Sequence, residues 1–169
     1  MEFATLYREL ANSTETIRAP LAGITQGDAQ FKPSPETWSI LEVTYHLYDE
    51  EREDFRARID VILNRPGETF QPIHPSKWVT ERMYNEKNFS EVHENFFIER
   101  TKSLDWLKDL AGADWDKTYT DEHRTITAGE MFASWIAHDN LHIRQLVELR
   151  RARIERITQP YIIEYAGEW

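Results

Sequence analysis

The feature that most constrains the fold is a seam of residues three and four positions apart in the last third of the chain. Its members are Met131, Trp135, His138, His142, Gln145 and Leu149. This alternating spacing places the side chains on one face of an α-helix and is typical of a helix that packs inside a bundle. The two histidines at i and i+4 therefore leave the same face one turn apart and point toward the core.

Three other segments show helical periodicity, so the sequence predicts four long helices, over residues 2–24, 39–63, 90–111 and 127–156. Capping boxes mark two of the starts, because Ser39 precedes Glu42 and Thr127 precedes Glu130 by three residues. Pro20 should kink or end the first helix. The pattern indicates an all-α protein, a four-helix bundle with long crossover connections.

The connections are expected to be irregular. The linker GDAQFKPSPETW carries two prolines and is predicted not to be helical. Long irregular stretches also follow the second helix, to about residue 88, and the third helix, over ADWDKTYTDEHRTI. Nothing resembles a strand before YIIEY in the tail, and one short strand would have no partner.

Length and composition indicate one domain over residues 1–169, without disulfides because the chain has no cysteine. With 20 basic and 30 acidic residues the formal charge is −10, which disfavours nucleic acid as a partner. The basic cluster of Arg144, Arg150, Arg151, Arg153 and Arg156 is expected to complement a helix dipole. No segment approaches the ~20 apolar residues of a membrane span and no signal peptide is evident, so we expect a cytoplasmic protein without a membrane partner.

The candidate metal ligands are His138 and His142 in the seam, together with His46 in the second predicted helix. Three neutral imidazoles can hold a divalent ion and leave positions open for water or substrate, as catalytic metal sites do. The alternative is that they are hydrogen-bonded core histidines, and spacing alone leaves both interpretations open. The motif HDNLH lacks the glutamate of HExxH, which argues against a zinc protease.

Nearby carboxylates could accept the second N–H of an imidazole. Asp49 and Glu50 lie about one turn after His46 and are candidates for this outer-shell role or for a fourth ligand. Asp139 follows His138 directly, and it would face solvent if it has no such role. The loop residues Trp78 and His123 are candidates for a substrate pocket.

The segments WSILEVTYHLYDEE, YNEKNFSEVHENFFIERTKSLDWLKDL and ITAGEMFASWIAHDNLHIRQLVEL resemble the DinB/YfiT superfamily across nearly the whole chain. The resemblance implies an antiparallel four-helix bundle with long crossovers, formed by a single DinB-like domain. It also implies a metal held by His46, His138 and His142. Three imidazoles suit zinc, nickel, iron or copper, and we expect zinc or nickel first. A low-molecular-weight thiol would be a further cofactor if the protein is a thiol transferase.

The resemblance leaves the reaction open, since the superfamily includes thiol S-transferases, metal-dependent hydrolases and uncharacterised stress-linked proteins. We expect a metal-dependent enzyme that acts on a small molecule. The alternative is a non-catalytic metal-binding or stress-related interaction protein. No catalytic residue beyond the metal ligands is identified. The aromatic loops and tail could line a pocket or form a dimer interface, and a homodimer is expected.

Overall fold

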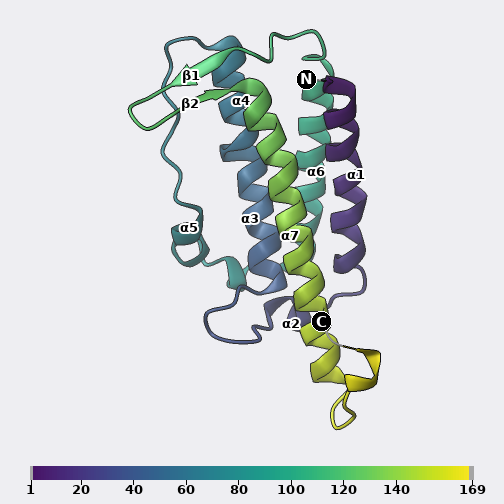
Figure 1. Cartoon of the computed structure of the whole chain (residues 1–169). Coiled ribbons are helices and arrows are strands. Elements are labelled where there is room, and N and C mark those ends of the chain that lie inside the picture. The colour runs from purple at the N-terminus through teal and green to yellow at the C-terminus, as the bar shows by residue number, and fades with distance from the viewer. Residues whose placement is uncertain (1, 168–169) are drawn as a thin grey trace.

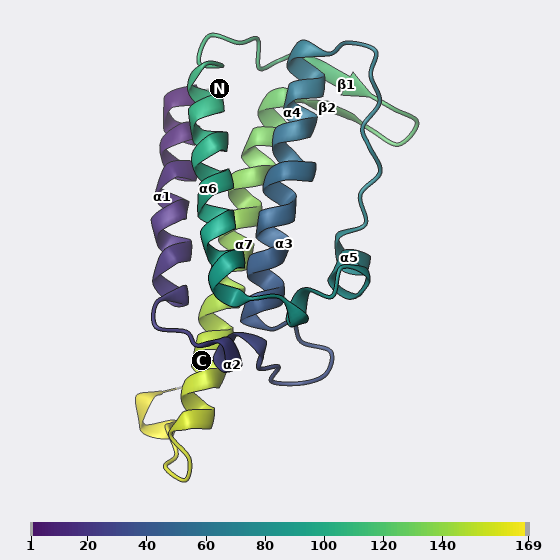
Figure 2. The same cartoon turned by 180° about the vertical axis from the view of Figure 1, so that it is seen from behind.

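The structure, a computed structural model, describes residues 2–167. Its elements in chain order are α1 (Phe3–Leu21), α2 (Gln26–Gln30), α3 (Ile40–Glu53), α4 (Phe55–Asn64), α5 (Pro75–Glu81), the 3₁₀ turn η1 (Tyr84–Glu86), α6 (Phe89–Lys108), β1 (Thr118–Thr120), β2 (Thr125–Thr127), α7 (Ala128–Ile157) and the 3₁₀ turn η2 (Glu164–Ala166). Helix α1, the α3–α4 pair, α6 and α7 form the predicted four-helix bundle (Figures 1 and 2).

The helices of the bundle form two groups of opposite direction. Helices α1 and α7 descend in Figure 1, whereas α3–α4 and α6 ascend. The most extensive contacts join α1 to α7 and α3 to α6, so the partners in each close pair point the same way. Since parallel neighbours cannot be joined by a short turn, the connection over residues 65–88 returns along the outside of the bundle and carries α5 (Figure 1).

Local sequence signals explain where the helices begin and end. The Ser39 hydroxyl accepts a hydrogen bond from the backbone N–H of Glu42, and the Glu42 carboxylate accepts one from the N–H of Ser39. Thr127 and Glu130 form the same reciprocal cap at the start of α7. Both predicted capping boxes are therefore present. Pro20 lies in the last turn of α1, which ends one residue later.

The structure corrects the prediction of one continuous helix over residues 39–63. Asp54, with φ −116° and ψ −95°, leaves the helical region and separates α3 from α4. Its carboxylate pairs with Arg58 in the first turn of α4. Neither glycine nor proline marks this break, so the sequence pattern gave no sign of it.

Three predictions about the connections were also wrong. The linker contains a short helix, α2, capped reciprocally by Thr25 and Asp28 ahead of its prolines. The stretch before α7 contains an antiparallel hairpin of β1 and β2, in which Tyr119 pairs with Ile126. The stretch after the second predicted helix, expected to be irregular, contains α5 and the 3₁₀ turn η1. The segment YIIEY in the tail, which had no strand partner in the sequence, forms no strand and runs into the 3₁₀ turn η2.

The core consists of two apolar clusters with a polar layer between them. One cluster includes Ile17, Leu47, Phe96 and Leu146, and the other includes Leu10, Phe55, Leu107 and Trp135. Helices α1, α6 and α7 each contribute to both clusters, while α3 contributes to the first and α4 to the second. Between these positions each helix places buried polar residues, among them Ser13, His46, Glu51, Arg100, Asp139 and His142. The candidate metal ligands belong to this middle layer.

Candidate metal centre

The three predicted ligands meet in the polar layer. Nε2 of His138 lies 3.1 Å from Nε2 of His46 and 3.1 Å from Nε2 of His142. His46 comes from α3 and the other two from consecutive turns of α7. His46 and His142 are each only 5% exposed. Among the described residues these three histidines form a group that could hold a metal ion.

The second ring nitrogens have different surroundings. Nδ1 of His142 donates a hydrogen bond to Oε1 of Gln145 over 2.8 Å, so Nε2 of this ring carries the lone pair. Nδ1 of His46 faces Oε1 of Glu50 at 3.7 Å, beyond hydrogen-bond length, and both atoms are buried without a hydrogen-bond partner. Of the three predicted outer-shell acids, Glu50 is therefore the one whose carboxyl group faces the second ring nitrogen of a candidate ligand.

The donor set fits a divalent cation. Two nitrogens that are each about 2.0–2.1 Å from one ion lie about 2.9 Å apart across a right angle and about 3.4 Å apart across a tetrahedral angle. The observed 3.1 Å falls within this range. Moreover, since Nε2 of His142 has no proton, Nε2 of His138 can form a good hydrogen bond in at most one of its two contacts. A shared cation would satisfy all three lone pairs.

Burial keeps the three imidazoles neutral, which is the form that binds metals. Desolvation, aided by the neighbouring histidines, lowers the pKa of His46 from 6.5 to about 2. Desolvation likewise lowers the pKa of His138 to about 4, with His142 contributing. The pKa of His142 is lowered by desolvation as well. At neutral pH no proton therefore competes for the Nε2 lone pairs.

Aromatic rings enclose the triad on two sides. The Trp38 ring lies edge-on to His46, with the centroids 5.1 Å apart, and parallel to the ring of His142. Phe55 packs against His138 at 5.1 Å. A cavity of about 440 Å³, lined by residues that include Trp38, Leu141, His142 and Gln145, lies beside the triad. The only evident approach to His142 among the cavities described is from this side.

Two of the predicted outer-shell acids have other partners. Asp49 is fully buried, but its carboxylate accepts hydrogen bonds from Arg52, Arg82 and Tyr84. Asp139 is also fully buried, which contradicts the solvent-facing alternative. Its carboxylate forms a two-pronged ion pair with Arg100 and not with an imidazole. The proximity of these acids to the ligands could be predicted from their spacing along each helix, but the direction of their side chains could not.

The predicted pocket residues line none of the described cavities. Trp78 is buried beneath the guanidinium of Arg82, 3.9 Å from the ring centroid, and lines none of the described cavities. His123 lies in the turn between β1 and β2, where its side chain is 76% exposed beside Glu122. Neither residue lines the cavity at His142, although Trp38 packs against the apolar cluster that contains Trp78.

Sequence reasoning missed three residues at the site. Trp38 directly precedes the Ser39 capping box and carries no sequence signal for a metal site, and Phe55 follows the helix break that the sequence did not reveal. Gln145 was recognised as a seam residue, and its position three residues after His142 was the signal for its hydrogen bond.

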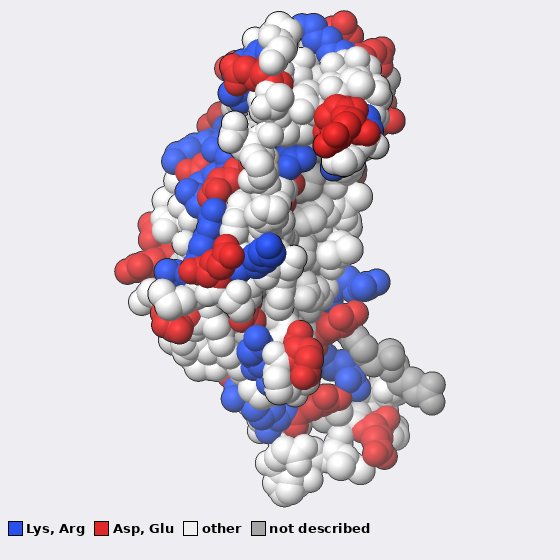
Figure 3. Space-filling model, turned by 90° about the vertical axis from the view of Figure 1, so that its left-hand side faces the viewer, with Lys and Arg blue, Asp and Glu red and all other residues white. Residues whose placement is uncertain are grey.

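The charged surface gives no separate site. The predicted basic cluster holds neighbouring elements: Arg150 donates to the carbonyls of Pro20 and Ala22, while Arg153 and Arg156 pair with Asp28 of α2. On the face drawn in Figure 3, basic and acidic side chains lie next to one another. None of the helices described is long and apolar enough to cross a membrane.

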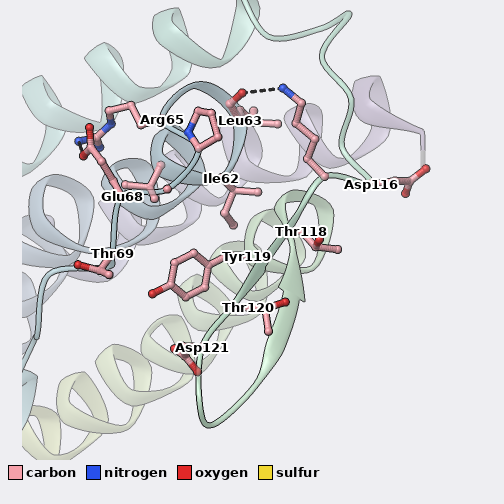
Figure 4. Close-up of a pocket in the computed structure, with 14 residues that line it drawn as sticks. Ile62, Leu63, Arg65, Glu68, Thr69, Asp116, Thr118, Tyr119, Thr120 and Asp121 are labelled. Carbon is pink, nitrogen blue, oxygen red and sulfur yellow. Dashed lines mark hydrogen bonds and ion pairs between the residues drawn. The ribbon is translucent and has the colours of Figure 1, made fainter.

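A larger cavity lies at the far end of the bundle. It measures about 660 Å³ and is enclosed by the end of α4, the following loop and strand β1 (Figure 4). Lys117 crosses it to donate to the carbonyl of Leu63, and Tyr119 stacks on Phe70 nearby. No histidine lines this cavity, so it is not part of the metal centre.

Comparison with known proteins agrees with the fold. A family model of the DinB superfamily matches residues 9–146. Among solved structures, YfiT from Bacillus subtilis, described as a probable metal-dependent hydrolase with an unusual four-helix bundle topology, superposes with a TM-score of 0.77 at 14% identity. The match covers 89% of this chain and 87% of that chain. No match was found among curated proteins.

Proposed function

The chain belongs to the DinB superfamily, and on that premise we propose that it is a metal-dependent hydrolase of a small molecule. The observation that carries this proposal is the convergence of Nε2 of His46, His138 and His142 beside a cavity. The description of YfiT as a probable metal-dependent hydrolase supports the same class of reaction. We infer zinc or nickel as the ion, since both accept imidazole ligands.

The residues around the triad would prepare the site in three ways. Gln145 fixes the ring of His142 and its tautomer, so that Nε2 faces the centre. Glu50 faces the ring of His46 and can orient it. Trp38 and Phe55 keep water away from the imidazoles. A divalent ion bound there would supply a Lewis acid that lowers the pKa of a coordinated water toward neutrality.

Metal analysis of purified protein tests the site. We expect close to one equivalent of a divalent metal in the wild type and in His93→Ala, a matched control on α6. We expect its loss in His46→Ala, His138→Ala and His142→Ala. Unchanged metal content in all three variants would place the ligands elsewhere.

Activity assays test the reaction. The wild type is screened against ester, amide and phosphoester substrates, with and without an added low-molecular-weight thiol. Metal-dependent hydrolysis without thiol supports the proposal. Turnover of electrophiles only in the presence of thiol would reassign the protein to the thiol S-transferases, and bound metal without any turnover would favour a non-catalytic role.

We further propose that the protein is a homodimer. Tyr161 and Ile162 near the end of the described chain are 78% and 75% exposed, and Ile157 of α7 is 51% exposed. Figure 1 shows that this end of α7 extends beyond the bundle. Exposed apolar side chains gathered at one place are typical of an interaction surface. Sedimentation at micromolar concentration checks the proposal, and a monomer would contradict it.

A further inference from the structure

We propose that Arg100 is a positioning residue of the metal centre, which holds helix α3 and helix α7 in the relative placement that brings His46 to His138 and His142. The inference rests on the proposed metal site, and it assigns a role to a group of residues that does not touch the ligands. We call Arg100, Glu51, Asp139, Ser13 and Ser103 the Arg100 network.

The contacts of Arg100 reach both ligand-bearing helices. From α6 its Nη1 and Nη2 donate to the two oxygens of Asp139 on α7, over 2.7 and 2.8 Å. Its Nε donates to Glu51 on α3. One planar guanidinium therefore binds a carboxylate on each helix at the same time, which a single ammonium group could not do with this geometry.

Two hydroxyl groups complete the network. Ser13 of α1 donates to Asp139, and Ser103 of α6 donates to the second oxygen of Glu51 over 2.7 Å. Arg100, Glu51 and Asp139 are each at most 1% exposed. A buried network with every member paired has one well-defined geometry, so it restricts how the four helices can move past one another.

The network is close to the ligands along both helices. Asp139 is the residue after His138 and lies three before His142, and Glu51 lies five after His46. The direct packing between α3 and α7 is less extensive than that of α3 with α6 and of α7 with α1. Helix α4 also packs on α7, whereas direct packing between α6 and α7 is sparse. Near the ligands, Arg100 joins α3, α6 and α7 by hydrogen bonds, so it can set the distance between the His46 and His138 rings.

Stability alone does not account for this arrangement. Burial of charged groups is costly, and replacement of a buried ion triad by apolar residues of similar size is often neutral or stabilising. Apolar side chains, however, allow several packings of similar energy, whereas the Arg100 network allows one. A site that needs three nitrogens at fixed spacing benefits from this restriction, because small displacements of a ligand weaken metal binding.

The test compares metal affinity with fold stability. The principal variant combines Glu51→Met, Arg100→Met and Asp139→Leu, and it leaves all three ligands intact. Ser13 can still donate to the carbonyl of Leu10, and the Ser103 hydroxyl still accepts from Arg56, so neither is stranded. The matched control is Arg56→Met with Glu99→Met, which removes an ion pair between α4 and α6.

Co²⁺ and Zn²⁺ are titrated into metal-free protein, and the thermal midpoint of the metal-free form is measured alongside. Titration of the wild type decides the proposed function first: without binding, the metal site itself is refuted. If the wild type binds, we expect the principal variant to keep its thermal midpoint and to lose about 10-fold to 100-fold in affinity. We also expect altered Co²⁺ absorption bands at saturation. The control should bind as the wild type does.

Wild-type affinity and Co²⁺ bands in a folded principal variant would overturn the inference, since a purely structural network predicts that result. If the principal variant fails to fold, Asp139→Asn takes its place. This change keeps the size of the side chain and weakens its hydrogen bonds with Arg100 and Ser13, while the ion pair of Arg100 with Glu51 stays. Altered Co²⁺ bands and weaker binding would then support the positioning role, and unchanged bands and affinity would refute it.

Discussion

The metal-free protein should lose stability in acid because its metal-site histidines are buried in the neutral form. In the unfolded chain an imidazole takes up its proton near pH 6.5, whereas folded His46 stays neutral until the pH approaches 2. The unfolded state therefore binds more protons than the folded state across this window. His46 therefore does not lower the free energy of unfolding above pH 6.5, and it lowers this free energy progressively as the pH falls from 6.5 toward 2.

The size of the effect follows from the pKa difference. A pH of 4 is about 2.5 units below the pKa of an imidazole in the unfolded chain, and each unit corresponds to about 1.4 kcal/mol. His46 alone should therefore lower the free energy of unfolding by about 3 kcal/mol at pH 4. His138, whose folded pKa is about 4, should cost a similar amount at this pH. Against a total stability of about 5–15 kcal/mol these losses are large.

The assay is urea unfolding of chelator-treated protein at pH 7 and pH 4. Wild type and His46→Gln are compared by the difference between the two free energies of unfolding. We expect this difference to be about 3 kcal/mol smaller in His46→Gln. His123→Gln, which changes an exposed histidine on the β1–β2 turn, should behave as the wild type does. An equal pH dependence in wild type and His46→Gln would refute the reasoning.

Three further changes test other parts of the structure. Burial, together with Asp54, raises the pKa of Glu50 well above its usual value, so the folded state loses stability as pH rises above about 4.5. Glu50→Gln lacks this loss. The free energy of urea unfolding of the variant minus that of the wild type should therefore be larger at pH 8 than at pH 5 by more than about 1 kcal/mol. Ser39→Ala removes the capping box of α3 and should cost about 1 kcal/mol in the same assay. Arg82→Met breaks ion pairs that hold the 65–88 connection to α3, and it should accelerate limited proteolysis there while the bundle stays intact.

The fold could be predicted because its signals are local. The seam around Trp135 and the capping boxes at Ser39 and Thr127 require only the spacing of residues within one or two turns. The break at Asp54 was missed because no glycine or proline marks it, and the short helix α2 was missed although its cap is visible in the sequence. In α2 the cap formed by Thr25 and Asp28 was as clear as the others, but the prolines that follow it dominated the interpretation. The hairpin lacks the glycine that usually marks such turns, and Asp121 instead accepts hydrogen bonds from the turn backbone.

The site was predictable only in part. The two α7 histidines share a face by helix geometry. His46 was a candidate from its place on another predicted helix, and the resemblance to the superfamily supported the set of three. The partners of the carboxylates were beyond the sequence, because they depend on how four helices meet. Asp139 looks like a surface residue when its helix is considered alone. It is buried because Arg100 of α6, 39 residues earlier in the chain, reaches it.

The polar layer also gives a physical reason for a site midway along the bundle. The apolar clusters above and below it fix each helix on both sides of the ligands, so the imidazoles have little freedom. A layer placed there excludes water and strengthens every charge interaction within it, but each polar atom then needs a partner. Around Arg100 this requirement is met. At the triad, Nδ1 of His46 and Oε1 of Glu50 are 3.7 Å apart, too far for a hydrogen bond. The three Nε2 atoms lie close together but do not carry enough protons for every contact between them to be a hydrogen bond. Within this layer the incompletely paired polar atoms therefore lie at and beside the three nitrogens where we place the ion.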